Sequence, residues 1–199
     1  MLPPVCSRCG LSLDADGACP DCLPGLHHLS ALRSWAIYDG PVRSAIHSLK
    51  YRGETSLGEI LARPLIEILS DLDWQIDLVT PVPLGEGRRK ERGYNQAALL
   101  ARPLALARRL NYHPEALERV RPTRTQVGLS RLDRRRNVAG AFVANPKVAE
   151  GKRVLMVDDV LTSGATLEAC AQALHAAGAT QVYGLTLTRA IPNGRRGTA

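Results

Sequence analysis

The chain has 199 residues, of which 45% are hydrophobic and 23% charged, a composition ordinary for a globular protein with one main domain. No apolar run approaches the roughly 20 residues of a membrane-spanning helix, and the first residues lack a basic and apolar leader, so we expect no membrane insertion and a cytoplasmic location. The net charge of +7 favours polyanionic partners such as phosphates, nucleotides or nucleic acid, with a merely solvated basic surface as the alternative.

The first 25 residues are rich in cysteine and lack a hydrophobic period. Two C-x-x-C pairs, Cys6 with Cys9 and Cys19 with Cys22, are separated by a nine-residue gap. Two thiolates at this spacing can ligate one metal ion from a tight turn, and four of them form a closed tetrahedral site. We therefore predict a zinc ribbon over 1–25 that holds a structural zinc ion, with a redox dithiol as the alternative.

After a linker over 26–33, the chain alternates between strand and helix patterns. The apolar spacing predicts a strand at 35–38, helices over 42–49 and 57–68, a strand at 76–79 and a helix over about 95–110. A capping box formed by Ser56 and Glu59 is expected to begin the second helix, and Pro64 to kink it. We predict that the arginine-rich segment 88–93 is a basic loop.

Two more strands and a helix complete the main domain. Apolar runs predict strands at 154–157 and 182–187, and helical spacing predicts a helix from Leu167 that ends at Gly178, with Cys170 on its buried face. Strands that alternate with helices indicate an α/β fold with a mostly parallel sheet flanked by helices. We assign this domain to 34–191 and a flexible tail to 192–199.

Two adjacent acids follow the strand at 154–157, where a parallel sheet places its ligands. After Asp158 and Asp159, the segment Thr162-Ser163-Gly164-Ala165-Thr166 turns into the helix. Backbone N–H groups at a helix N-terminus and nearby hydroxyls favour a bound anion, and adjacent carboxylates can accept hydrogen bonds from a vicinal diol. The segment therefore predicts a ribose 5-phosphate site, and an ordinary acidic loop is the alternative.

The segment 154–166 resembles the 13-residue signature of type I phosphoribosyltransferases, and the chain as a whole is similar to the ComF family. Besides the four cysteines, the resemblance rests on Leu49-Lys50-Tyr51-Arg52-Gly53, Val82-Pro83, Arg92-Gly93-Tyr94-Asn95-Gln96, Arg124-Thr125-Gln126 and Arg136-Asn137-Val138. It implies the type I phosphoribosyltransferase fold and a site for 5-phosphoribosyl-1-pyrophosphate with Mg²⁺.

The resemblance also implies roles for individual residues. Asp158 and Asp159 would hold the ribose hydroxyls beside Mg²⁺, and 162–166 would hold the 5-phosphate. A pyrophosphate loop and a mobile lid would contain Arg88, Arg92, Arg124, Gln126, Arg131 and Arg136. Thr162 stands where purine-salvage transferases have an acid, so the sequence identifies no general base.

Two functions follow from these patterns. The first is a phosphoribosyltransferase in which pyrophosphate leaves the anomeric carbon, linked by the ComF resemblance to DNA uptake and natural competence. The second is a non-catalytic competence factor that binds single-stranded DNA and competence proteins and uses the fold as a ligand sensor. Seven arginines and one acid within 119–136 fit a nucleic-acid surface, whereas an aromatic content of 4% is low for base stacking.

Overall fold

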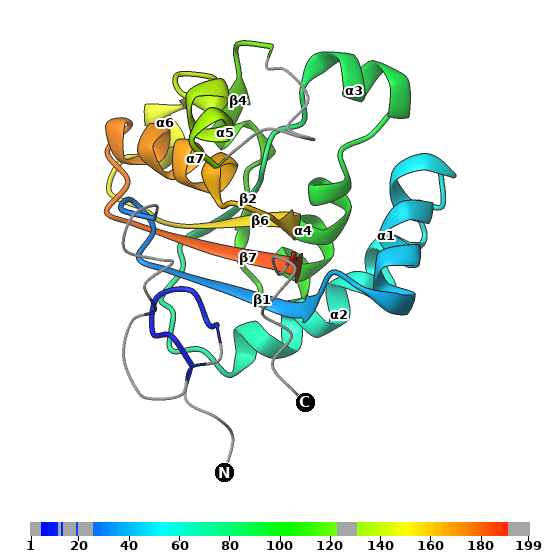
Figure 1. The fold of residues 1–199 in the computed structure, drawn as a ribbon. Helices are drawn as coiled ribbons and strands as arrows, with labels where there is room; N and C mark the ends of the chain where they lie inside the picture. Colours follow the sequence, from blue (N-terminus) through cyan, green and yellow to red (C-terminus); the bar gives the residue numbers. More distant parts are fainter. Residues whose placement is uncertain (1–4, 12, 14–18, 20–25, 123–130, 191–199) are drawn as a thin grey trace.

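A parallel β-sheet organises the chain in the computed structural model, which describes residues 5–11, 13, 19, 26–122 and 131–190 (Figure 1). The sheet has five strands in the order β1-β7-β6-β2-β3, and every neighbouring pair is parallel. Its strands are β1 (Ala31–Ile37), β7 (Gln181–Arg189), β6 (Arg153–Leu161), β2 (Leu78–Pro81) and β3 (Asn111–Tyr112). A small antiparallel pair joins β4 (Leu117–Arg119) to β5 (Phe142–Ala144).

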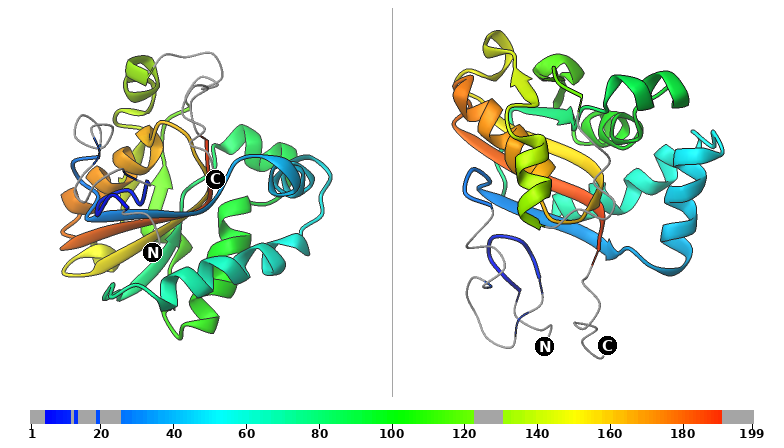
Figure 2. Two further views of the ribbon diagram at one scale, coloured as in Figure 1. Left: turned by 60° about the horizontal axis from the view of Figure 1, so that its bottom comes forward. Right: turned by 45° about the horizontal axis from the view of Figure 1, so that its top comes forward.

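Helices cover both faces of the parallel sheet (Figure 2). One face packs against α1 (Gly40–Tyr51), α2 (Leu57–Ser70) and α4 (Gln96–Ala107). The other packs against α7 (Ala165–Ala176), beside which lie α5 (Arg131–Val138), α6 (Pro146–Ala149) and the β4–β5 pair. The short helix α3 (Glu86–Arg92) and the 3₁₀ turn η1 (Pro114–Ala116) complete the fold.

The alternation of side chains along β6 divides the core into two layers. Val154 and Met156 belong to the apolar cluster on the α7 side, whereas Leu155 and Val157 belong to the cluster on the α2 and α4 side. All four side chains are fully buried, as expected for a central parallel strand covered on both faces. The expected α/β fold with a mostly parallel sheet is therefore confirmed.

Several boundaries differ from those that the sequence predicts. The segment 88–93 is mostly helical, because α3 runs from Glu86 to Arg92 and ends at Gly93, whose φ of 81° fits a left-handed cap. The prediction of a capping box at Ser56 and Glu59 is wrong, because Ser56 has helical backbone angles and its side chain makes no capping hydrogen bond. The strand predicted at 154–157 continues to Leu161 and so includes both aspartates.

The described part of the cysteine-rich segment packs directly against the main domain. Cys6, Cys9 and Cys19 are buried in the same apolar cluster as the helix α7. The N–H group of Leu32 in β1 donates to the carbonyl of Arg8 at 2.6 Å, so this segment lies against the edge strand of the sheet. Within the described ranges, none of the helices is both long and apolar enough to span a membrane.

Candidate phosphoribosyl site

Asp158 and Asp159 lie near the carboxyl end of β6, the edge at which open α/β sheets bind their ligands. Because neighbouring residues of a strand point to opposite faces, the two carboxylates do not lie side by side. Asp159 turns toward α1, where its Oδ2 pairs with the Nζ of Lys50. Asp158 faces the α7 layer, where burial and then the negative charge of Asp158 raise the pKa of the Cys170 thiol.

The Asp159–Lys50 ion pair is mostly buried. Asp159 is 8% exposed, and the Lys50 side chain reaches it from the last turn of α1. The backbone carbonyl of Asp159 also accepts a hydrogen bond from the Thr188 hydroxyl of β7 at 3.2 Å. The sequence prediction did not assign Lys50 to the site, although its position within the Leu49–Gly53 motif was a usable signal.

Asp158 is in a different electrostatic environment from its neighbour. Its Oδ1 accepts a hydrogen bond from the backbone N–H of Asp159 at 2.9 Å. Desolvation, followed by the negative charge of the Asp159 carboxylate, raises the pKa of Asp158 well above its ordinary value. A carboxyl group whose ionised form is disfavoured in this way would be stabilised as a carboxylate by a cation or a hydroxyl donor.

The turn between β6 and α7 has the geometry of an anion-binding loop. Gly164 has a φ of 77°, and a Cβ placed on it would come within 2.8 Å of the Leu26 side chain, so glycine is the residue that fits. The N–H groups in the first turn of α7 have no partner within the helix. Thr162 is exposed, Ser163 and Thr166 are partly buried, and Ala165 is buried with its N–H directed at the Ser163 hydroxyl.

Two arginines lie near the loop that follows β2. Arg88 is exposed on α3, and Arg119 of β4 approaches the loop so closely that a Cβ on Gly85 would lie 3.0 Å from its guanidinium. Burial and the positive charge of Arg88 lower the pKa of Arg119, which also interacts electrostatically with Cys170. The sequence did not single out Arg119, because nothing distinguishes it from the other arginines of 119–136 before the fold brings it to this loop.

The remaining arginines expected in the site occupy different places. Arg92 donates a hydrogen bond to Gln96 at 2.8 Å and stacks on Tyr51, so it faces α1 and α4. Arg136 is exposed on α5, which packs against α7. Arg124 and Gln126 lie outside the described residues, as does the side chain of Arg131, so the lid stays a prediction.

The described cysteines are arranged as metal ligands. The Sγ atoms of Cys6, Cys9 and Cys19 all lie within 4.8 Å of one another, and those of Cys9 and Cys19 are 3.5 Å apart. Sulfur atoms about 3.8 Å apart are expected around a tetrahedral zinc with bonds of about 2.3 Å. The Cys6 Sγ also accepts N–H groups from Cys9 and Cys19, which stabilises a thiolate. These residues fit a structural metal ion, and Cys22, the fourth predicted ligand, lies outside the described residues.

The segment after the cysteines connects the metal site to the anion loop. The backbone N–H groups of His27 and His28 donate to Oε1 of Glu168 in α7, at 2.8 and 3.0 Å. The His28 Nδ1 lies 2.7 Å from the same oxygen. These histidines therefore hold the first turns of α7 in place rather than extend the cysteine cluster.

Comparisons with known proteins agree with this architecture. Residues 91–191 match the family model described as "Phosphoribosyl transferase domain". The chain is 35% identical to "DNA utilization protein YhgH" of Escherichia coli strain K12, over 92% of this chain and 90% of that protein. It is 32% identical to "Competence protein F" of Haemophilus influenzae, over 94% and 85% of the two chains.

Among solved structures, the chain is similar to the glutamine phosphoribosylpyrophosphate amidotransferase from B. subtilis, complexed with ADP and GMP. The identity is 27% and the TM-score 0.43, over 67% of this chain and 26% of that chain. The family model and the nearly full-length relatives are decisive: the chain belongs to the ComF family of proteins with a phosphoribosyltransferase domain.

Proposed function

We propose that the chain binds 5-phosphoribosyl-1-pyrophosphate with Mg²⁺ at the carboxyl end of β6. The observation that carries this proposal is the glycine turn at the N-terminus of α7, which follows two aspartates near the carboxyl end of the central strand. The turn offers N–H groups and hydroxyls to the 5-phosphate, while the carboxylates can accept hydrogen bonds from the ribose hydroxyls. Neither feature alone would distinguish a phosphoribosyl ligand from a simple anion.

The two aspartates play unequal parts in this proposal. Asp158 would hold Mg²⁺ or a ribose hydroxyl, and the cation or hydroxyl donor would stabilise the carboxylate form that desolvation and Asp159 disfavour. Asp159 becomes available when its partner Lys50 turns toward the anionic pyrophosphate. Mg²⁺ would neutralise charge on the pyrophosphate oxygens. We expect Arg88 and Arg119, which are close enough to affect each other's charge, to pair with the same group.

Calorimetric titration of the wild-type protein tests this assignment. Mg²⁺ with 5-phosphoribosyl-1-pyrophosphate should bind more tightly than ribose 5-phosphate or pyrophosphate alone, because only the complete ligand reaches both the anion loop and the arginines. Equal affinity for pyrophosphate alone would show a simple anion site and contradict the proposal. Exchange of labelled pyrophosphate into the ligand, with and without nucleophilic acceptors, then separates a transferase from a binding protein.

A nucleic-acid partner is the second function that we propose. The names of two relatives refer to DNA utilization and to competence, and the chain has a net charge of +7. The arginines of α5 add to this charge on the α7 side of the sheet. Measuring the binding of a labelled single-stranded oligonucleotide at 50 and 200 mM salt tests the idea, because electrostatic binding weakens steeply over this range.

The cysteine cluster completes the proposal as a structural zinc site on Cys6, Cys9, Cys19 and Cys22. Thiolates that ligate a metal, together with the free thiol of the buried Cys170, suit a reducing compartment such as the cytoplasm. Metal analysis of the purified protein should give one zinc per chain. A chain purified without chelators that contains no zinc would contradict this part of the proposal.

A further inference from the structure

Tyr51, the last residue of α1, presents an aromatic ring to solvent. It is 61% exposed, the second largest exposure among the large hydrophobic side chains of the described residues. The His47 ring lies 4.7 Å from it at an interplanar angle of 45°, and the Arg92 guanidinium lies 4.9 Å from its centroid. The ring is therefore supported by two neighbours while much of its surface remains accessible, which prepares it to stack on another flat group.

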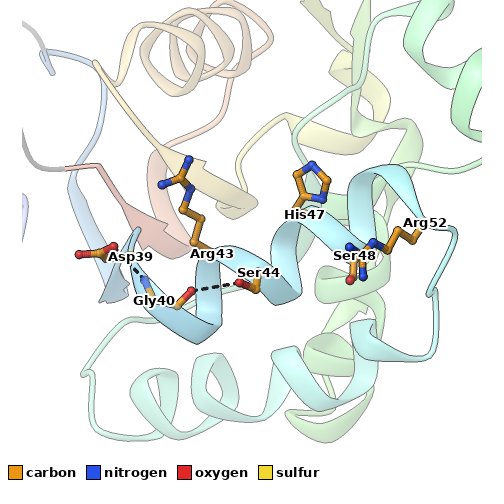
Figure 3. Close-up of a pocket in the computed structure, with 7 residues that line it drawn as sticks. All are labelled: Asp39, Gly40, Arg43, Ser44, His47, Ser48 and Arg52. Atoms are coloured by element: carbon orange, nitrogen blue, oxygen red, sulfur yellow. Dashed lines mark hydrogen bonds between the residues drawn. The ribbon is translucent and has the colours of Figure 1, made fainter.

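A basic groove of about 440 Å³ runs along α1 (Figure 3), and His47, whose ring contacts Tyr51, is part of its lining. Arg43 and His47 project from the same side of the helix, and Arg52 lies at its end. The hydroxyls of Ser44 and Ser48 add polar groups to the lining. Asp39, the acid of the groove, accepts a hydrogen bond from the N–H of Gly40 and so caps the helix. Because the basic side chains of the groove outnumber its one acid, the groove suits a negatively charged phosphate group.

The positive charge extends beyond the groove. From Arg43 to Arg52, α1 spans about 13 Å at 1.5 Å per residue. Arg92 connects Tyr51 to α3, whose four basic residues outnumber its two acids, Glu86 and Glu91, and Glu86 is paired with Lys90. A mononucleotide has phosphate at one position only, whereas a polynucleotide strand has a phosphate at every nucleotide and can therefore contact the whole row of basic side chains.

We propose that the α1 face, defined as Arg43, His47, Tyr51 and Arg52, binds single-stranded nucleic acid with one base stacked on Tyr51. The proposal rests on the nucleic-acid function proposed above and assigns its surface. A single strand fits because its bases are free to stack on an exposed ring, whereas those of a duplex are not. This surface lies against the α2 and α4 side of the sheet, away from the arginines of α5 that pack beside α7.

Binding of a fluorescent oligothymidylate, measured by anisotropy, tests the surface. Tyr51→Ala should weaken binding about 5- to 100-fold, the loss expected for one stacked base, whereas Tyr51→Trp should retain it. Arg43→Gln with Arg52→Gln should reduce the slope of log affinity against log salt by about 1.4, at about 0.7 per phosphate contact. Arg102→Gln, an exposed arginine of α4, is the matched control and should leave affinity and slope unchanged.

The possible outcomes distinguish the surface from the other proposals. If Tyr51→Ala binds the oligonucleotide with wild-type affinity, the proposal that the α1 face is the binding surface is overturned. Failure of the wild-type protein to bind the oligonucleotide would overturn both the face and the nucleic-acid function. Titration of the wild-type protein with Mg²⁺ and 5-phosphoribosyl-1-pyrophosphate, as described above, judges the phosphoribosyl site separately.

Discussion

At the scale of single residues, two adjacent aspartates of one strand have different physical roles. Asp159 is mostly buried and its charge is neutralised by Lys50. The pKa of Asp158, in contrast, is raised by desolvation and by the negative charge of Asp159. The sequence Asp-Asp gives no sign of this difference, because it arises from the side-chain alternation of a strand that continues past both residues. The ion pair and the raised pKa each lead to a testable consequence.

The ion pair predicts strong coupling between Lys50 and Asp159. Lys50→Met leaves a mostly buried carboxylate without its partner and should lower the free energy of unfolding by about 3 kcal/mol. Adding Asp159→Asn to this variant removes the unpaired charge and should restore much of the loss. Urea unfolding of both variants measures the coupling, with the exposed Lys147→Met as the control. Additive losses in the double variant would show that the pair is not coupled.

The raised pKa of Asp158 predicts a pH-dependent gain in stability for Asp158→Asn. A carboxyl group whose pKa is higher in the folded state costs no stability below its unfolded pKa, and costs more as the pH rises through the folded value. The asparagine removes this cost, so the variant should melt at the wild-type temperature near pH 4 and above it near pH 8. Thermal melts at the two pH values check this, and a constant difference between them would contradict it.

At the scale of elements, α7 connects two features that the sequence presents as separate modules. Its first turn forms the anion loop, and Glu168 within it accepts the N–H groups of His27 and His28, just after the cysteines. Leu26 fills the space beside Gly164, and the described cysteines share an apolar cluster with the helix. The described cysteines, Leu26 and the start of α7 are therefore parts of one packed unit.

This connection predicts that loss of the metal disturbs the anion loop. Cys9→Ser should increase amide hydrogen exchange in 161–170, because the segment that holds Glu168 and covers Gly164 is no longer anchored. Exchange in β2, which lies in the interior of the sheet, should change much less. Zinc analysis of the same samples confirms that the metal is lost. Unchanged exchange in 161–170 after loss of the metal would show that the two features are independent.

At the scale of the whole molecule, the sequence predicted the fold better than the site. Apolar runs such as Val154–Val157 and the helical spacing of Leu167 to Leu174 report burial directly, so the parallel sheet and its helices could be derived from them. Pro64 and Pro103 lie inside α2 and α4, as the helical spacing of the surrounding apolar residues indicated. Arg119 could not be assigned, because only the fold brings β4 to the loop that follows β2, whereas the motif around Lys50 was a signal that the prediction did not use.

The function proposed for the whole molecule depends on Asp158 holding a phosphoribosyl ligand at the carboxyl end of β6. The most direct test is calorimetric titration of Asp158→Asn with Mg²⁺ and 5-phosphoribosyl-1-pyrophosphate, beside Asp73→Asn, an exposed aspartate before β2. We expect Asp158→Asn to lose at least tenfold in affinity while melting no lower than the wild type, and Asp73→Asn to keep the wild-type affinity. Wild-type affinity in Asp158→Asn would contradict the assignment of the site.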